Sequence, residues 1–273
     1  VTLMYDMSSH IQMRMSYAKG YRAPQIFDED LHIETSGSRK VIHQNHPDLK
    51  QETSHSYMAS VDLNGRIGKL FTSLLVEGFY TQLNNPFANE LGSIDENDVV
   101  IYTRVNADNG AVVQGVNFEQ TMSPSSKFFV KVGATVQKSE YSDVREFNVR
   151  DFFRTPSSYG FYTLSWEPLK KFTLSSTGTY TGKMLIPYFG TTLDVPEDGE
   201  LRQSDPFFDV NLRLSYDIRI NGATLQLFGG AKNILNSYQN DFDSGIHRDP
   251  GYIYGPNQPV SYTHLTLPTK RIV

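Results

Sequence analysis

Histidines gather in the first part of the sequence, where their spacing raises the question of a metal site. His43 and His46 form an H-x-x-H pair, with His32 and Asp48 nearby and His55 further along. Imidazole and carboxylate groups are common ligands of transition metals. The segment has no helical spacing and no second ligand motif, so the sequence predicts exposed loop histidines and no metal site.

Covalent catalysis has one candidate pair, Ser54 and His55. A serine nucleophile needs a base within hydrogen-bonding distance, but adjacent residues of a strand point to opposite faces. The sequence contains no G-x-S-x-G element, no P-loop and no G-x-G-x-x-G motif. It also contains no cysteine, which excludes disulfides, thiolate metal sites and cysteine nucleophiles. We therefore expect no enzyme and no cofactor.

Two predicted loops, 183–205 and 232–251, carry residues that suit the capture of a large solute. Aromatic faces and charged groups on loops are typical of binding surfaces. The alternative is that these side chains pack the loops against one another. The candidates for solute binding are Tyr188, Phe189, Tyr238, Phe242, His247 and Arg248.

The composition narrows the class of protein that must position these residues. The net charge is −5 and the pI is about 5.8, so there is no basic surplus and we expect no nucleic-acid partner. The 16 tyrosines and 17 phenylalanines favour β-structure with interfacial or membrane-facing surfaces. No apolar run is long enough for a transmembrane helix. The mean hydropathy of −0.41 still permits a barrel, in which only alternate residues meet lipid.

Apolar and polar residues alternate along most of the sequence, as in FDVNLRLSYD (208–217) and FFVKVGATVQK (128–138). This period predicts antiparallel strands and no helix longer than a turn or two. Several polar faces carry charges that would line a hydrated interior: Arg14, Glu77, Glu119, Lys131, Asp209 and Arg213. Aromatic residues near the ends of the apolar rows would form interfacial girdles: Tyr17, Tyr57, Tyr80, Trp166, Tyr180 and Tyr216.

Short and long connections between the predicted strands take turns along the chain. The short ones lie near residue 8 and at 64–68, 123–127, 167–171 and 217–222. The long ones are 20–49, about 84–98, 140–158, 183–205 and 232–251. A sandwich has no reason to gather every long loop at one end, whereas a transmembrane barrel does. The fold class predicted is therefore an all-β, antiparallel transmembrane β-barrel.

The predicted crossings indicate part of a larger barrel. They are 1–7, 9–19, 50–63, 69–83, 99–122, 127–139, 159–167, 172–182, 207–217, 223–232 and a last one after 251. The fifth is long, and we expect a bulge at 108–110 to break it. Bacterial barrels have even strand numbers, so about 10–11 strands indicate a fragment. Residue 1 lies inside a strand pattern, which also predicts that the chain belongs to something longer.

Four stretches, in the same order along the chain, resemble TonB-dependent outer-membrane receptors. They are MSYAKGYRAPQIFDEDLHIE (15–34), NHPDLKQETSHSYMASVDL (45–63), NADNGAVVQGVNFEQTM (106–122) and LFGGAKNILNSYQNDFDSGIHRDPGYIYGPNQP (227–259). Each motif alone is weak, and the ordered set is specific. The last is similar to the version found in Bacteroidetes-type bacteria.

The resemblance implies a 22-strand barrel closed by an N-terminal plug domain, and we expect this chain to hold about 10–11 of those strands and none of the plug. It implies uptake across the outer membrane of a Gram-negative bacterium of a scarce, large solute such as a ferric siderophore or cobalamin. The partners implied are TonB, acting through the plug, outer-membrane lipid and the extracellular solute. The six interior charges would then contact the plug or be solvated. A passive porin-type channel and a barrel enzyme with Ser54 and His55 at its outer rim are the alternatives.

Residues 260–273 break the pattern of a closing strand. The stretch VSYTHLTLPT (260–269) back-translates to a sequence that resembles read-through of a transposon-type sequencing-library adapter. A genuine edge strand is the alternative. We predict that residues 1–259 are the C-terminal part of the receptor barrel and that residues 260–273 are a non-native tail.

Overall fold

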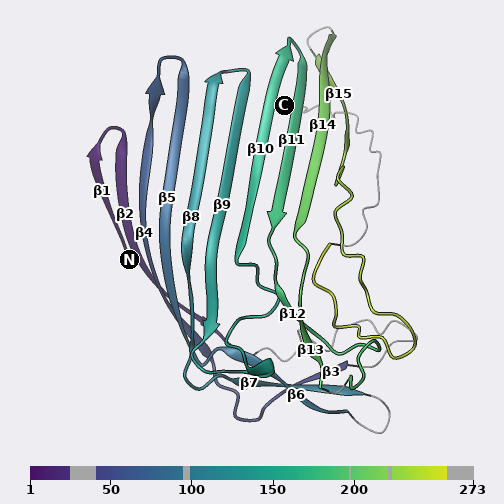
Figure 1. Ribbon diagram of the computed structural model, residues 1–273. Coiled ribbons are helices and arrows are strands. Elements are labelled where there is room, and N and C mark those ends of the chain that lie inside the picture. Colours follow the sequence, from purple (N-terminus) through teal and green to yellow (C-terminus); the bar gives the residue numbers. More distant parts are fainter. Residues whose placement is uncertain (25–40, 95–98, 197, 221–222, 257–273) are drawn as a thin grey trace.

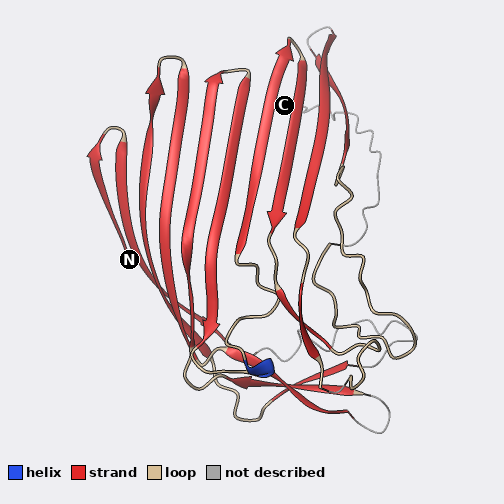
Figure 2. Cartoon of the chain, viewed as in Figure 1, coloured by secondary structure: helices blue, strands red, loops and turns tan. Residues whose placement is uncertain are grey.

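The computed structural model describes residues 1–24, 41–94, 99–196, 198–220 and 223–256. Within these ranges the chain forms fifteen strands and one 3-10 turn, η1 (Glu146–Asn148) (Figure 2). None of the helical structure described is long and apolar enough to cross a membrane. The all-β prediction is confirmed.

Ten strands form one curved antiparallel sheet, in which each strand pairs with the members before and after it along the chain (Figure 1). Short turns join strands at one end of this sheet and long connections emerge at the other. In spatial order the strands are β1 (Thr2–Ser8), β2 (Ile11–Arg22), β4 (Glu52–Ile67), β5 (Leu70–Asn84), β8 (Ala111–Ser125), β9 (Phe128–Tyr141), β10 (Ser158–Leu169), β11 (Phe172–Thr181), β14 (Phe207–Ile220) and β15 (Ala223–Ala231).

The sheet is open. Strands β1 and β15 lie at its two edges and do not pair with each other. Each edge therefore presents backbone N–H and C=O groups that are not bonded across a ladder. The structure is a fragment of a barrel wall, as the strand count predicts. Residues 251–256 form no strand, and the rest of the predicted closing segment, with the tail 260–273, lies outside the described residues.

Two small sheets lie at the end of the molecule where the long connections emerge (Figure 1). In one, the middle strand pairs in parallel with one neighbour and antiparallel with the other. Its members are β3 (Val41–Asn45), β7 (Val100–Asn106) and β6 (Phe87–Ile94). The second is a hairpin of β12 (Leu185–Tyr188) and β13 (Glu200–Gln203).

The predicted single crossing 99–122 is wrong. Its first part is β7 of the small sheet and its second part is β8 of the large sheet. A tight turn at 107–110 separates them where we expected a bulge, and Gly110 closes it with φ +79°. A glycine is required because a Cβ there would lie 2.5 Å from the Leu83 carbonyl oxygen. The crossing was also too long, because about ten residues of tilted strand span a bilayer.

The register separates the large sheet into two chemically different faces. One row runs from Arg14 to Ser60, Glu77, Asn117 and Thr135 across five strands, and we call this side the polar face. Its side chains bond one another: Thr135 Oγ1 donates to Asn117 Oδ1 (2.8 Å) and Asn117 Nδ2 donates to Glu77 Oε1 (3.0 Å). Polar residues cooperate across strands because opposed side chains on one face lie within reach.

The opposite side, the apolar face, exposes large hydrophobic residues. Val116, Val136 and Leu214 are 50%, 65% and 43% exposed on β8, β9 and β14. The buried hydrophobic core lies instead beneath the loops, where Met184, Ile186, Tyr188, Phe207 and Tyr252 form one cluster. An apolar exterior around a polar interior is the arrangement of a membrane barrel wall.

Candidate functional site

A cavity of about 470 Å³ lies among the long connections. Its walls come from the end of β2, from β6, β7 and the end of β9, from the 142–157 connection, from the tip of β12 and from residues near 250. Segments far apart in the sequence therefore meet around one space. The residues that line it are Arg22, Phe87, Ala88, Asn89, Tyr102, Arg104, Tyr141, Arg145, Glu146, Asp151, Phe152, Phe153, Arg154, Pro187, Phe189, Asp249, Pro250 and Gly251.

Four arginines and six aromatic residues dominate this cavity. Strand alternation positions Arg22, because it is in phase with Arg14 on the polar face of β2. Arg104 is held in the small sheet, opposite Asn45 on one side and Asn89 on the other. Arg145 and Arg154 come from the irregular 142–157 connection. The guanidinium groups are thus held by three separate pieces of chain: β2, β7 and the 142–157 connection.

Three of the four arginines lie near aromatic rings, and the fourth, Arg154, donates to the Gly251 carbonyl oxygen (2.6 Å). The Arg22 and Arg104 guanidinium carbons lie 5.3 Å and 5.8 Å from the Phe87 ring centroid. Arg145 lies 5.8 Å from the Tyr141 ring centroid and its Nη2 lies 3.4 Å from Glu90 Oε1. Cations near ring faces are stabilised by the ring quadrupole. Such stacking holds the flat cation in place.

Three carboxylates, Glu146, Asp151 and Asp249, also line the cavity. Asp249 Oδ2 accepts a bond from the Phe189 backbone N–H (3.3 Å) and its Oδ1 accepts one from Gly251 (2.8 Å). Burial raises the pKa of Asp249 above its ordinary value, and these bonds oppose the rise. The lining holds four arginines and three carboxylates, and Glu90 pairs with Arg145 beside it, so the formal charges balance. The guanidinium groups and aromatic rings together suit a solute with both anionic and aromatic groups.

A cluster that we call the loop core, formed by Tyr188, Arg202, Asp243 and their partners, lies beside the cavity. The Arg202 guanidinium lies 3.4 Å from the Tyr188 ring centroid and pairs with Glu200. The Tyr188 hydroxyl donates to Asp243 Oδ1 (2.8 Å), and Thr191 N–H donates to Asp243 Oδ2 (3.2 Å). Burial alone would raise the pKa of Asp243, but the hydrogen bonds that it accepts outweigh burial and lower it. These contacts fasten the β12–β13 hairpin to the 232–256 segment.

The structure separates the six residues predicted to bind solute. Phe189 lines the cavity, with its ring 6.4 Å from Tyr102 and 5.9 Å from Phe147. Tyr188 is 1% exposed inside the loop core, the position expected from the alternative that these residues pack loops together. Tyr238 and Arg248 are half-buried, and Phe242 and His247 are exposed; these four lie outside the lining of this cavity.

The six charges predicted to face the interior all lie on the polar face, but they differ in their contacts. Lys131 Nζ pairs with Glu119 Oε1 at 2.8 Å. Arg14 Nε donates to Gln12 (2.8 Å) and Arg213 Nη2 to Gln226 (3.4 Å). Asp209 Oδ1 is buried and accepts no hydrogen bond from the described residues, and the same holds for Asp62 Oδ1.

The histidines and the candidate nucleophile do not form a reactive site in the described part of the chain. His32 lies outside the described residues, as does the side chain of His43, and His46 Nδ1 accepts from the Asp48 backbone N–H (3.2 Å). Among the residues described, no three His, Asp or Glu side chains gather as metal ligands. Ser54 opposes Gly20 on the polar face, whereas His55 lies on the other face with Nδ1 2.7 Å from the Tyr17 hydroxyl.

Sequence reasoning missed the four arginines of the cavity. Arg22 had the clearest signal, because it sits in the KGYRAP stretch at the loop end of a predicted strand. Arg145 and Arg154 lie in a connection with no motif, and Arg104 lies in the segment interpreted as a single crossing. These arginines come together only through tertiary contacts between β2, β7 and the 142–157 connection, which no local sequence pattern indicates.

Comparison with known families now decides the class. Residues 1–234 match the β-barrel of TonB-dependent receptor-like proteins. The chain belongs to the TonB-dependent receptor family. Comparison with curated proteins found no match. Members of this family are outer-membrane β-barrels of Gram-negative bacteria, and they transport solutes and do not act as enzymes. The enzyme alternative built on Ser54 and His55 is therefore not supported.

Solved receptors of the same family have the same fold. The ferric enterobactin receptor PfeA of Pseudomonas aeruginosa, in complex with enterobactin, is 16% identical with a TM-score of 0.63, over 93% of this chain and 37% of the receptor. The FrpB iron transporter of Neisseria meningitidis is 15% identical with a TM-score of 0.57, over 90% and 35%. The copper transporter OprC is 11% identical with a TM-score of 0.64, over 94% and 37%. This TonB-dependent receptor chain thus spans little more than a third of their length.

Proposed function

We propose that this chain forms part of the wall and outer rim of a TonB-dependent receptor that takes up a scarce, large, anionic solute, with a ferric siderophore as the leading candidate. The cavity of stacked arginines and aromatic rings carries this proposal. Anionic oxygens would bond the guanidinium groups, and flat groups of the solute would stack on the rings. That a receptor of the same fold is described in complex with enterobactin supports the same class of solute.

The polar face supports the presence of a plug inside the complete barrel. Asp62 and Asp209 each have a buried carboxylate oxygen that accepts no hydrogen bond from the described residues. An unpaired buried acceptor costs about 1–3 kcal/mol, so such groups normally find a donor. Both oxygens are covered by atoms of this chain, so a donor on a domain seated within the barrel would reach them only after the side chain turns toward the interior. A passive porin-type channel has no such domain, so a contact of either carboxylate with a plug would favour the receptor.

The remaining partners follow from this assignment. TonB would act through the plug and move it, so that the solute passes from the cavity into the barrel interior. The outer membrane of a Gram-negative bacterium is the location, because the exposed apolar face needs a lipid environment. Cobalamin is a weaker candidate than an anionic iron complex, because the four arginines of the cavity would bind anionic oxygens preferentially.

The proposal is tested with the full-length receptor and ferric enterobactin as the probe. Arg22→Gln removes one guanidinium from the cavity while keeping a polar side chain of similar size. We expect its affinity for the anionic complex, measured by calorimetry, to fall about tenfold or more, because a hydrogen bond to a charged group contributes about 1.5–3 kcal/mol.

Arg219→Gln is the matched control, since Arg219 is exposed near the short turns at the far end of the sheet. It makes the same change in net charge and should leave the affinity unchanged. Equal affinities for Arg22→Gln and the unaltered receptor would contradict the proposed site. Tighter binding of cyanocobalamin than of the iron complex would contradict the proposed solute.

A further inference from the structure

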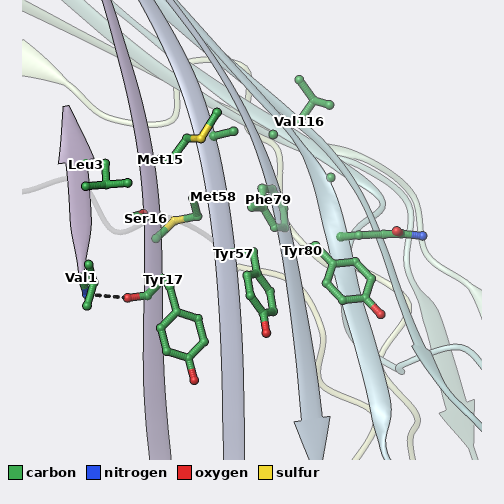
Figure 3. A pocket seen from close by; sticks show the side chains of 14 residues that line it. Val1, Leu3, Met15, Ser16, Tyr17, Tyr57, Met58, Phe79, Tyr80 and Val116 are labelled. Atoms are coloured by element: carbon green, nitrogen blue, oxygen red, sulfur yellow. Dashed lines mark hydrogen bonds between the residues drawn. The ribbon is translucent and has the colours of Figure 1, made fainter. Parts of the chain in front are cut away.

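A shallow groove of about 800 Å³ lies on the apolar face near the β1 edge (Figure 3). Its floor is formed by Ala59, Gly78 and Val116, which oppose one another across β4, β5 and β8. The groove is hollow because the first two residues have little or no side chain. Gly78 contributes no side chain, and a Cβ built there would meet nothing within 4 Å. Leu3 and Met15 form one wall. Its surface is predominantly hydrocarbon.

Three tyrosines border the groove on the side of the long connections. Tyr17 opposes Tyr57, and Tyr57 opposes Tyr80, so one phenol comes from each of three successive strands. The Tyr17 and Tyr57 ring centroids are 5.3 Å apart. Figure 3 shows all three hydroxyls pointing the same way, along the strands and away from Leu3. Rings of this kind mark the level where hydrocarbon gives way to polar headgroups.

The next row of the same face is polar and holds one cation, Lys19. Lys19 opposes His55, and His55 opposes Gln82. The Tyr17 hydroxyl lies 2.7 Å from His55 Nδ1, which ties this row to the tyrosines, and Lys19 is exposed. Between the tyrosines and the short turns, the apolar face of β1, β2, β4 and β5, which is described throughout, carries no charged side chain. A hydrocarbon groove therefore ends in a phenol row and then in a polar row that carries the Lys19 ammonium group.

We propose that this groove binds an anionic membrane lipid, with an acyl chain along Ala59 and Gly78 and a phosphate headgroup at Lys19 and His55. The sequence of chemistries along the strands, apolar then phenolic then cationic, matches that of a phosphate-bearing lipid from tail to head. A further barrel strand paired to β1 would extend the sheet edgewise and leave this face uncovered. The proposal relies on the membrane location proposed above, but not on the identity of the solute.

The test uses the full-length receptor, stripped of lipid in mild detergent, with dioleoyl phosphatidic acid and dioleoyl phosphatidylcholine as probes. Native mass spectrometry counts the lipid molecules retained. We expect the unaltered receptor to retain phosphatidic acid at least fivefold more tightly than phosphatidylcholine. Gly78→Leu places a large side chain in the groove, where its Cβ meets nothing within 4 Å, and should reduce retention of both lipids at least fivefold. Lys19→Gln should remove the preference for phosphatidic acid and keep the weaker binding common to both.

Matched controls come from the same face and the same residue types. Gly229 also lies on the apolar face, opposite Leu214, with nothing within 4 Å of an added Cβ, so Gly229→Leu should leave lipid retention unchanged. Lys170→Gln, at a short turn, controls for net charge. Inorganic phosphate should not compete with phosphatidic acid, because it lacks the acyl chain.

Three results would overturn the proposal. One is equal retention of phosphatidic acid and phosphatidylcholine by the unaltered receptor. Another is an equal effect of Gly78→Leu and Gly229→Leu. The third is a preference for phosphatidic acid that survives Lys19→Gln. Ferric enterobactin binding, measured on the same samples, separates this outcome from failure of the uptake proposal, because the groove and the cavity share no lining residue.

Discussion

The adjacent aromatic residues Tyr188 and Phe189 occupy different environments at the tip of β12. Tyr188 points into the loop core, where its hydroxyl bonds Asp243 and its ring stacks under Arg202. Phe189 faces the cavity beside Tyr102. One residue holds the hairpin in place and the next is available to a solute. Of these two adjacent aromatic residues, one therefore supports the loop structure and the other is placed to bind a solute.

This difference predicts two distinct phenotypes. Tyr188→Phe removes the hydroxyl that donates to Asp243 and accepts from Thr192, so the loop core should lose about 1–2 kcal/mol of stability. Hydrogen exchange of the β12–β13 hairpin measures this loss. Phe189→Ala should leave that exchange nearly unchanged and reduce solute affinity directly. Faster exchange in Phe189→Ala than in Tyr188→Phe would contradict the assignment.

Gly110 gives a second prediction at the level of single residues. Gly110→Ala places a methyl group 2.5 Å from the Leu83 carbonyl oxygen in a backbone with φ +79°. We expect a loss of about 1–3 kcal/mol, measured as a lower midpoint of thermal unfolding of the full-length receptor. Gly245→Ala is the control, because Gly245 has φ +92° but an open surrounding. Equal losses would show that the clash with Leu83 contributes nothing.

At the level of elements, the β12–β13 hairpin is held to the 232–256 segment chiefly by carboxylates. Asp243 accepts bonds from Tyr188, Thr191 and the Asp249 backbone N–H (2.7 Å). Asp241 accepts bonds from the hydroxyls of Tyr252 and Tyr254. Burial, followed by this bond to Asp241, raises the pKa of Tyr254. The loops that shape the cavity are thus joined by ionised groups that accept several donors each.

The lowered pKa of Asp243 predicts how this junction responds to acid. Because the folded state favours the carboxylate, its stabilising effect is complete above the ordinary carboxyl pKa of about 3.9 and is lost as the pH falls below it. Asp243→Asn should make the hairpin exchange faster at neutral pH. The difference in exchange rate between Asp243→Asn and the unaltered receptor, corrected for intrinsic rates, should be constant down to about pH 4.5 and shrink at lower pH.

The pKa of Asp249 is shifted in the opposite direction, so Asp249 changes the stability of the hairpin with pH in the opposite way. Its raised pKa means that the folded state favours the protonated acid, so its contribution decreases as the pH rises through the carboxyl range. Asp249→Asn should therefore stabilise the hairpin slightly at neutral pH, whereas Asp243→Asn destabilises it. Destabilisation of similar size by both variants would contradict the two pKa directions.

The elements that sequence could predict are those governed by alternation within one strand. The strands of the large sheet, their two faces and the short turns follow from period two, as FDVNLRLSYD in β14 illustrates. The β3–β7–β6 sheet could not be predicted this way, because β3 pairs in parallel with a strand far along the chain. The convergence of Arg22, Arg104, Arg145 and Arg154 likewise depends on tertiary contacts between connections without a repeating pattern.

At the scale of the whole molecule, the polar and apolar faces exchange the usual positions of core and surface. Large hydrophobic residues face outward along the sheet, and the polar face holds hydrogen-bonded rows such as Glu77, Asn117 and Thr135. Charged pairs there, such as Lys131 with Glu119, are about one-third exposed and contribute modestly by themselves. Together these polar groups form the inner surface that a domain or water inside the barrel would contact.

Asp209, whose Oδ1 accepts no hydrogen bond from the described residues, allows a test of whether a plug contacts the polar face. If a plug supplies its donor, Asp209→Asn should lower the thermal midpoint of the full-length receptor by an amount equivalent to about 1–3 kcal/mol. The same change in a receptor from which the plug has been deleted should be neutral or stabilising, because it removes a buried charge. Asp205→Asn, at an exposed position, is the control. Effects of the same sign in both receptors would contradict a plug contact at Asp209.

The strand order has a consequence for the path of folding. Because every strand of the large sheet pairs with the members before and after it along the chain, most of its ladders close short or moderate loops. Such local pairings form early and at low entropic cost. Each finished hairpin offers an edge as the template for the next, so the wall can grow strand by strand. Ring closure, which must join strands distant in sequence, is then the step that we expect to limit the rate of assembly.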